Sequence, residues 1–165
     1  MIFASDEQLK YLSTAKTLFI DGTFKIVSKP FVQLLSIHLF AKHEDNMKQL
    51  PGVFVLMPRK RKKDYKKVLQ QILKLLPSPP VAERLVADFE DGLWRAIKTV
   101  FPDIHIQGCA FHWGQAVWHH VQEQGLQVLP LIFFKKEYIL KMFNVMRIGS
   151  YFDIIMIMKI PVISF

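Results

Sequence analysis

The sequence contains a single cysteine, which excludes an internal disulfide framework and fits a reducing compartment. It has no apolar run approaching the roughly 20 residues that a membrane-spanning helix needs. The first residues include Asp6 and Glu7 and lack the apolar core of a signal peptide. We therefore expect a nuclear or cytoplasmic protein that is not secreted and has no membrane as a partner.

Acidic residues are in the minority, because 14 Asp and Glu stand against 22 Lys and Arg and give a formal net charge of +8. Such an excess favours a polyanionic partner, although a merely basic soluble protein fits the charge as well. Hydrophobic residues make up 51% of the 165 residues, enough for the core of one domain. No small-molecule substrate is expected, and the sequence does not indicate an oligomeric state.

The first half of the chain predicts three strands. Apolar residues alternate over residues 17–27 around Asp21, which predicts a strand that carries an acidic side chain. The nearly continuous apolar run at 31–41 predicts a strand buried on both faces, and residues 52–57 predict a third. Residues 42–49 are charged and are interpreted as a loop. Short connections make these three strands an antiparallel meander.

A helix is expected next, because apolar residues recur at helical spacing over residues 65–76 until Pro77. Residues 1–16 show no comparable pattern. They are interpreted as a partial helix or a ragged start.

The second half of the chain predicts alternating strands and helices. Residues 84–87 form a short apolar run that ends at Asp88, and residues 104–109 alternate up to the cysteine. Apolar side chains at helical spacing follow each strand, and Asp91 is the expected N-cap of the first of these helices. Parallel strands joined by crossover helices are typical of α/β proteins, in which functional groups gather at the carboxyl ends of the strands.

This element order describes an α/β protein with an incomplete ribonuclease-H-like core: a three-stranded antiparallel meander followed by alternating helices and parallel strands. In that arrangement the strands of Asp21 and Asp88 are neighbours, about 4.8 Å apart, which would bring the two carboxylates face to face. Hard oxygen ligands suit Mg²⁺ or Mn²⁺, ions that serve phosphodiester chemistry. The alternative is that each aspartate is only a turn or cap residue.

Three motifs in this order resemble the transposase domain of Mutator-like elements (MULE). They are Phe-Ile-Asp-Gly-Thr-Phe at residues 19–24, Val-Ala-Asp-Phe-Glu at residues 86–90, and Cys-Ala-Phe-His-Trp-Gly-Gln at residues 109–115. The resemblance runs over about residues 17–127. It implies a ribonuclease-H-like core that cuts and joins DNA at an Asp-Asp-Glu metal site loaded with Mg²⁺ or Mn²⁺.

In this resemblance Asp21 matches the first acidic ligand of the family and Asp88 matches the second. Glu90, two residues after Asp88, is a weaker candidate for an acidic ligand. The third acid of the family lies beyond a helical insertion, well after the Cys-x-x-His element, and neither Glu123 nor Glu137 is assigned to it. We therefore expect a chain that binds a divalent metal weakly and shows little or no strand cleavage.

Cys109 and His112 have the spacing of metal ligands, and His119 follows two helical turns later. A structural zinc site needs four ligands, and no second cysteine exists. The pattern therefore favours a buried thiol and a histidine at a helix start over zinc.

Five consecutive basic residues precede the first predicted crossover helix: Arg59, Lys60, Arg61, Lys62 and Lys63. We interpret this basic run as a nucleic-acid-binding patch or a nuclear-import signal, and a solvated loop is the alternative. Cations at a helix N-terminus oppose the helix dipole, and this local cost favours a function.

Residues 128–165 are mostly apolar, keep no regular period and fall outside the resemblance. They fit either core elements or a segment that does not belong to the fold. The expected organisation is thus a start at 1–16, a transposase-like domain at 17–127 and this tail. Three functions remain open: a transposase-derived domain that is inactive as given, a domesticated non-catalytic nucleic-acid-binding module, or a structural remnant without a DNA role.

Overall fold

The computed structural model describes residues 1–24, 26–43 and 46–123. The chain divides into two compact units, Met1–Gly108 and Cys109–Phe165. The apolar tail at 128–165 lies outside the described residues, and so does Glu137. Among the helices of the described part, none is long and apolar enough to cross a membrane.

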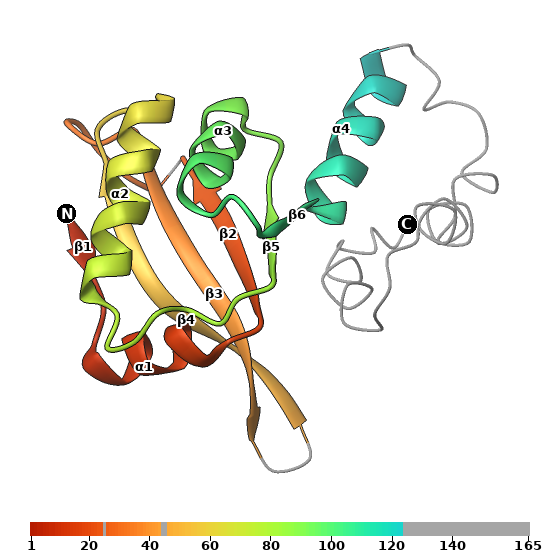
Figure 1. The fold of residues 1–165 in the computed structure, drawn as a ribbon. Helices are drawn as coiled ribbons and strands as arrows, with labels where there is room; N and C mark the ends of the chain where they lie inside the picture. The colour runs from red at the N-terminus through yellow and green to blue at the C-terminus, as the bar shows by residue number, and fades with distance from the viewer. Residues whose placement is uncertain (25, 44–45, 124–165) are drawn as a thin grey trace. The chain divides into compact units, whose positions relative to one another are not determined.

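The first unit is built on a mixed six-stranded sheet with the order β1-β4-β3-β2-β5-β6 (Figure 1). The strands are β1 (Ile2–Phe3), β2 (Thr17–Thr23), β3 (Gln33–His43), β4 (Asn46–Met57), β5 (Arg84–Ala87) and β6 (His105–Gly108). Strands β2, β3 and β4 pair antiparallel, β5 runs parallel to β2, and β6 runs parallel to β5. The predicted α/β class, the meander and the strand order that follows it are therefore confirmed.

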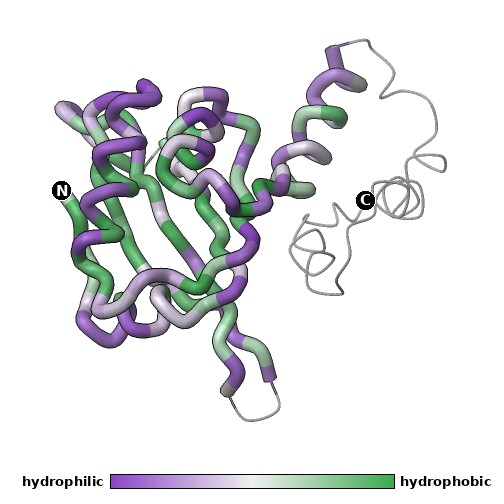
Figure 2. Tube along the Cα trace, viewed as in Figure 1, coloured by the Kyte–Doolittle hydropathy of each residue, from purple (hydrophilic) through white to green (hydrophobic). Residues whose placement is uncertain are grey.

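The helices are α1 (Asp6–Thr14), α2 (Lys62–Leu75), α3 (Asp91–Val100) and α4 (Ala110–Glu123). In the first unit, α2 and α3 lie side by side over one face of the sheet (Figure 1). Helix α2 buries Tyr65, Leu69 and Ile72, whose spacing of three and four residues gives one apolar face. Figure 2 shows that apolar residues predominate along the strands and that polar residues alternate with them along the helices.

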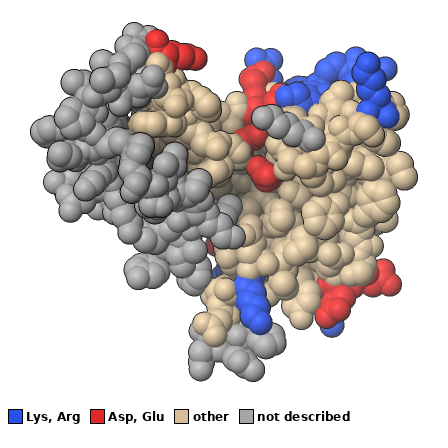
Figure 3. All heavy atoms as spheres, turned by 180° about the vertical axis from the view of Figure 1, so that it is seen from behind, with Lys and Arg blue, Asp and Glu red and all other residues tan. Residues whose placement is uncertain are grey.

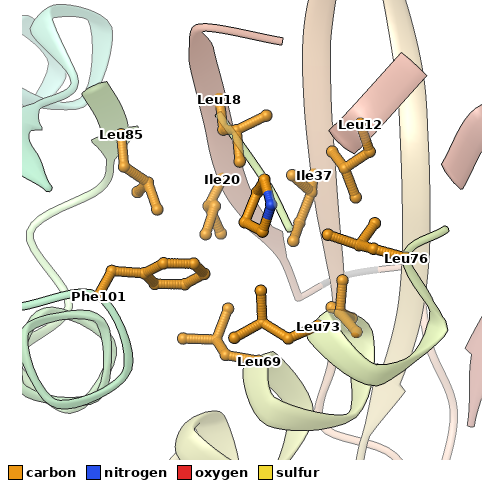
Figure 4. A pocket seen from close by; sticks show the side chains of 11 residues that line it. Leu12, Leu18, Ile20, Ile37, Leu69, Leu73, Leu76, Leu85 and Phe101 are labelled. Carbon is orange, nitrogen blue, oxygen red and sulfur yellow. The ribbon is translucent and has the colours of Figure 1, made fainter. Parts of the chain in front are cut away.

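The core lies between the sheet and its helices. Figure 4 shows Leu12 of α1, Leu69 of α2 and Ile20 of β2 pointing toward one another. The cavity among these side chains has a volume of about 20 Å³ and an apolar lining, so it is a packing gap of the core and offers nothing to hold a polar ligand.

Of the two interpretations of residues 1–16, the partial helix is confirmed and the ragged start is wrong, because this segment belongs to the sheet and the core. Strand β1 pairs with β4, and α1 buries Leu9 and Leu12. A reciprocal cap fixes the start of α1: the Gln8 backbone N–H donates to Ser5 Oγ at 3.2 Å, and the Ser5 backbone N–H donates to Gln8 Oε1 at 2.7 Å. Ser-x-x-Gln is a recognised start signal that the apolar period does not show.

The interpretation of residues 42–49 as a loop is wrong for residues 42–43 and 46–49, which are strand. Strand β3 continues to His43 and β4 begins at Asn46, so the two strands form a long hairpin. Polar residues are tolerated here because the side chains described near the hairpin tip are exposed. The pairing shifts register between Ile37 and His38, opposite Pro51 and Gly52, as expected at a bulge next to a residue that cannot donate to the ladder.

The sequence predicted Asp91 as the N-cap of α3, and this prediction is wrong. Glu90 is the N-cap and Asp91 is the first helical residue. The Asp91 carboxylate accepts a hydrogen bond from Arg95 Nε at 2.9 Å, one turn further along the helix. An acidic side chain in the first turn still favours the helix through its dipole.

Candidate functional site

The two aspartates occupy matching positions on neighbouring parallel strands. The register of β2 and β5 ends with the pair Ile20 and Ala87, which are both buried. Asp21 is the next residue of β2, and Asp88 is the first residue after β5. Both are half-buried. Because neighbouring strands lie about 4.8 Å apart, this register makes positions 21 and 88 neighbours at the carboxyl ends of β2 and β5.

Asp21 lies on the side of the sheet away from α2 and α3, because Ile20 before it points into the core beneath α2 and alternate residues face opposite sides. Thr23 Oγ1 donates to Asp21 Oδ2 at 3.4 Å, and Ser36 Oγ donates to the Asp21 carbonyl oxygen at 3.5 Å. His38 Nε2 lies 2.8 Å from Ser36 Oγ. The polar side chains of Ser36 and His38 on β3 therefore lie next to Asp21.

His38 is a titratable group near Asp21 that the sequence analysis missed. Burial lowers its pKa below the usual value, and the negative charge of Asp21 opposes this shift in part. A serine and a histidine two residues apart in an apolar strand share one face, and this alternation was the available signal.

A buried hydrogen-bonded pair supports the carboxyl end of β2 from the core side. Tyr65 Oη lies 2.8 Å from Gln33 Nε2 and 3.2 Å from Gln33 Oε1, and Gln33 is 0% exposed. Burial raises the pKa of Tyr65, and the charges of Asp88 and Glu90 act in the same direction. A Cβ on Gly22 would lie 3.3 Å from Gln33 Oε1, so the pair packs directly beneath the residue that follows Asp21.

The loop that begins with Asp88 is held by aromatic side chains. Trp94 Nε1 donates to the Asp88 carbonyl oxygen at 2.6 Å. The Phe89 ring stacks on Trp94 with 6.1 Å between centroids and 16° between planes. Phe89 also covers Gly108 at the end of β6, where an added Cβ would lie 2.5 Å from Phe89 Cζ. Glycine at position 108 therefore permits the observed position of the ring.

The basic run lies beside this loop. Lys60 Nζ lies 3.2 Å from Glu90 Oε2 and 4.2 Å from the centroid of the Phe24 ring, so it joins the segments that follow β2 and β5. A Cβ on Gly92 would lie 2.9 Å from the Lys60 carbonyl oxygen. Glu90 is the N-cap of α3 and does not lie on a strand, and its carboxylate is bound by Lys60.

Two of the five basic residues have carboxylate partners. Besides Lys60, Arg61 contacts Asp64 through Nε to Oδ2 at 2.7 Å and Nη2 to Oδ1 at 3.3 Å, and this hydrogen bonding lowers the pKa of Asp64. Arg59, Lys62 and Lys63 are exposed and form no ion pair within the part of the chain that the structure describes. Figure 3 shows carboxylates next to a cluster of Lys and Arg at the upper edge of the molecule.

In the second unit, Cys109 and His112 lie at the start of α4. Burial acts to raise the pKa of Cys109, but hydrogen bonds to His112 and Phe111 and the charge of His112 together outweigh it, so the pKa is lowered. His119 lies further along α4 and is exposed. Within residues 1–24, 26–43 and 46–123, no group of three His, Cys, Asp or Glu side chains is placed to hold a metal ion.

The chain was also compared with known proteins. No curated protein matches it. The family model of the MULE transposase domain matches residues 17–116, which is more than half of the 165 residues and includes the acidic positions 21 and 88. The chain therefore belongs to the MULE transposase domain family.

Proposed function

We propose that the chain is a transposase-derived DNA-binding domain with a ribonuclease-H-like fold, in which Asp21 and Asp88 hold a divalent ion, Mg²⁺ or Mn²⁺. The observation that carries this proposal is the register of β2 and β5, which ends one residue before both aspartates. Functional groups in sheets with parallel strands gather at such carboxyl ends.

The donor set fits a weakly held ion. Two carboxylates supply hard oxygen ligands of the kind that Mg²⁺ and Mn²⁺ prefer. Glu90, two residues after Asp88, is bound to Lys60. A bound ion would supply Lewis-acid stabilisation to a phosphodiester oxygen. Because no third His, Cys, Asp or Glu among the described residues is placed to complete a metal site with the two aspartates, we propose that strand cleavage is weak or absent.

The basic run supports a DNA partner. Its free cations, Arg59, Lys62 and Lys63, lie around the start of α2. The same region contacts the loop of Asp88 through Lys60 and Glu90. Cations that bind phosphates would thus hold a nucleic acid backbone beside the acidic pair.

A thermal melt with and without millimolar Mn²⁺ tests the metal site. A ligand that binds only the native state raises the melting temperature, so Mn²⁺ should stabilise the unmutated chain. Asp21→Asn with Asp88→Asn should abolish this shift and leave the metal-free protein equally or more stable, since the two negative charges repel. Asp103→Asn is the matched control, because Asp103 is exposed and precedes β6 at the opposite end of the parallel strands. Absence of a shift in the unmutated chain would refute the metal site.

A supercoiled-plasmid nicking assay on the same preparation tests the second part. Little or no nicking is expected, and nicking that the double mutant loses would show that a third ligand completes the site. DNA binding without a metal shift would instead favour a non-catalytic nucleic-acid-binding module. The bound Glu90 is the observation that supports this second candidate.

A further inference from the structure

Two exposed phenylalanines closely follow the two aspartates in the sequence. Phe24 is 44% exposed and is the first residue after β2, and Phe89 is 54% exposed and directly follows Asp88. We propose that Phe24 and Phe89 form a stacking site for unpaired bases of a DNA strand that passes the acidic pair. This inference rests on the proposed nucleic-acid function and assigns to it the single-stranded form of the substrate.

Each ring already has a defined contact within the first unit. Phe89 stacks on Trp94, which is itself tied to the Asp88 carbonyl oxygen, and its edge covers Gly108. Phe24 carries the Lys60 ammonium group on its ring. A rigid aromatic side chain loses little conformational entropy on binding, so this arrangement suits recognition.

The chemistry around the rings points to single-stranded nucleic acid. Sites of this kind combine cations that follow the backbone with aromatic faces on which bases stack. Arg59, Lys62 and Lys63 supply the free cations, and they belong to the same run as Lys60, which contacts the Phe24 ring. In a duplex the faces of each base are covered by the neighbouring bases. Stacking of bases on Phe24 and Phe89 therefore requires an unpaired strand.

Fluorescence anisotropy with the full chain and a labelled single-stranded oligonucleotide tests this site. Phe89→Leu and Phe24→Leu keep an apolar side chain but remove the aromatic face. Each should weaken single-strand binding by about fivefold or more, while binding to a duplex of the same sequence changes little. Tyr11→Leu is the matched control, because Tyr11 is 43% exposed on α1 and should leave both affinities unchanged.

Two further variants separate stacking from a structural effect. Phe89→Trp should preserve single-strand affinity, and its indole fluorescence should be quenched by the oligonucleotide relative to the unmutated chain. Gly108→Ala keeps the Phe89 side chain but displaces its ring, since the added Cβ would lie 2.5 Å from Cζ. It should reduce single-strand affinity as Phe89→Leu does.

The outcomes distinguish this inference from the proposed function. Salt-dependent duplex binding together with single-strand binding that is unaffected by either leucine variant overturns the stacking site and leaves the DNA-binding domain intact. Absence of binding to both oligonucleotides overturns the proposed function and the stacking site together. Unchanged indole fluorescence in Phe89→Trp, despite binding, also refutes stacking at this position.

Discussion

Lys60 and Glu90 are 30 residues apart in the sequence and form a salt bridge of 3.2 Å. This pair joins the basic run to the N-cap of α3, which lies two residues after Asp88. It shows that the five consecutive cations are not equivalent. Some of their charge is used inside the protein and some remains available to a partner.

Neutralising the free cations should weaken DNA binding more than neutralising the paired ones. Arg59, Lys62 and Lys63 have no carboxylate partner among the described residues, so their replacement by alanine removes charge that is available to DNA. The plot of log K against log salt should then flatten by up to about 0.9 for each phosphate that the protein no longer neutralises. Lys60→Ala with Arg61→Ala should change the slope less. The measurement is duplex affinity over a series of salt concentrations.

The control for this experiment is a set of exposed lysines elsewhere, since net charge alone affects non-specific binding. Lys10, Lys74 and Lys98 lie on three different helices and are all exposed. Their replacement by alanine changes the net charge equally but should leave most of the slope in place. An equal reduction of the slope in both triple variants would show that the basic run is only a solvated loop.

Removal of the Leu12 side chain should destabilise the first unit strongly. Leu12 is 2% exposed and belongs to the main core, so Leu12→Ala leaves a cavity and should cost about 2–5 kcal/mol. The neighbouring Tyr11 is 43% exposed, and Tyr11→Ala should cost much less. Denaturant unfolding of both variants measures the difference, and equal stability would mean that α1 does not contribute to the core.

The hydrogen-bonded pair beneath β2 should show the asymmetry of buried polar groups. Tyr65→Phe leaves the buried Gln33 amide without its tyrosine partner and should cost about 1–3 kcal/mol. Adding Gln33→Met removes the amide that needs a partner, so the double variant should recover part of this stability. Thermal melts of the single and double variants check this, and strictly additive destabilisation would contradict it.

His38 should make the fold sensitive to mild acid. Its folded-state pKa lies below the unfolded value of about 6.5, so the unfolded chain takes up this proton first as the pH falls. The stability that neutral His38 contributes is present above about pH 6.5 and is lost as the pH drops towards the folded-state pKa. His38→Gln should therefore lose less stability than the unmutated chain between about pH 7.5 and about pH 5.5.

An NMR titration of the imidazole protons checks the cause of this shift. Asp21→Asn removes the charge that opposes the lowering, so the pKa of His38 should fall further. A rise in that variant would contradict the electrostatic interaction between the two residues.

The sequence was informative where burial imposes a simple period. The strand at residues 84–87 and the helix that begins near residue 91 were predicted close to their observed bounds, because each has one apolar side or two. The extension of β3 and β4 into residues 42–43 and 46–49 was not predicted, because these ends of the strands pair with each other at an exposed tip, where no apolar alternation is needed. The contribution of residues 1–16 to the fold was not predicted, because the start of their helix is marked by a cap and not by a long apolar period.

The acidic pair could be placed from sequence because it needs only the strand order, and the register of β2 with β5 agrees with that order. The groups around it could not. The contact of Lys60 with Phe24 and Glu90 depends on three loops meeting in space, and residue types along a loop carry no record of such meetings.

Gly92 has one more consequence. Gly92 has no side chain, and a Cβ added at this position would lie 2.9 Å from the Lys60 carbonyl oxygen. Glycine therefore permits the close approach of α3 to the basic run. A larger residue at position 92 would push the backbone of the basic run away from the loop of Asp88. In the proposed DNA complex, Gly92 would therefore fix the distance between a phosphate bound by the basic run and the acidic pair.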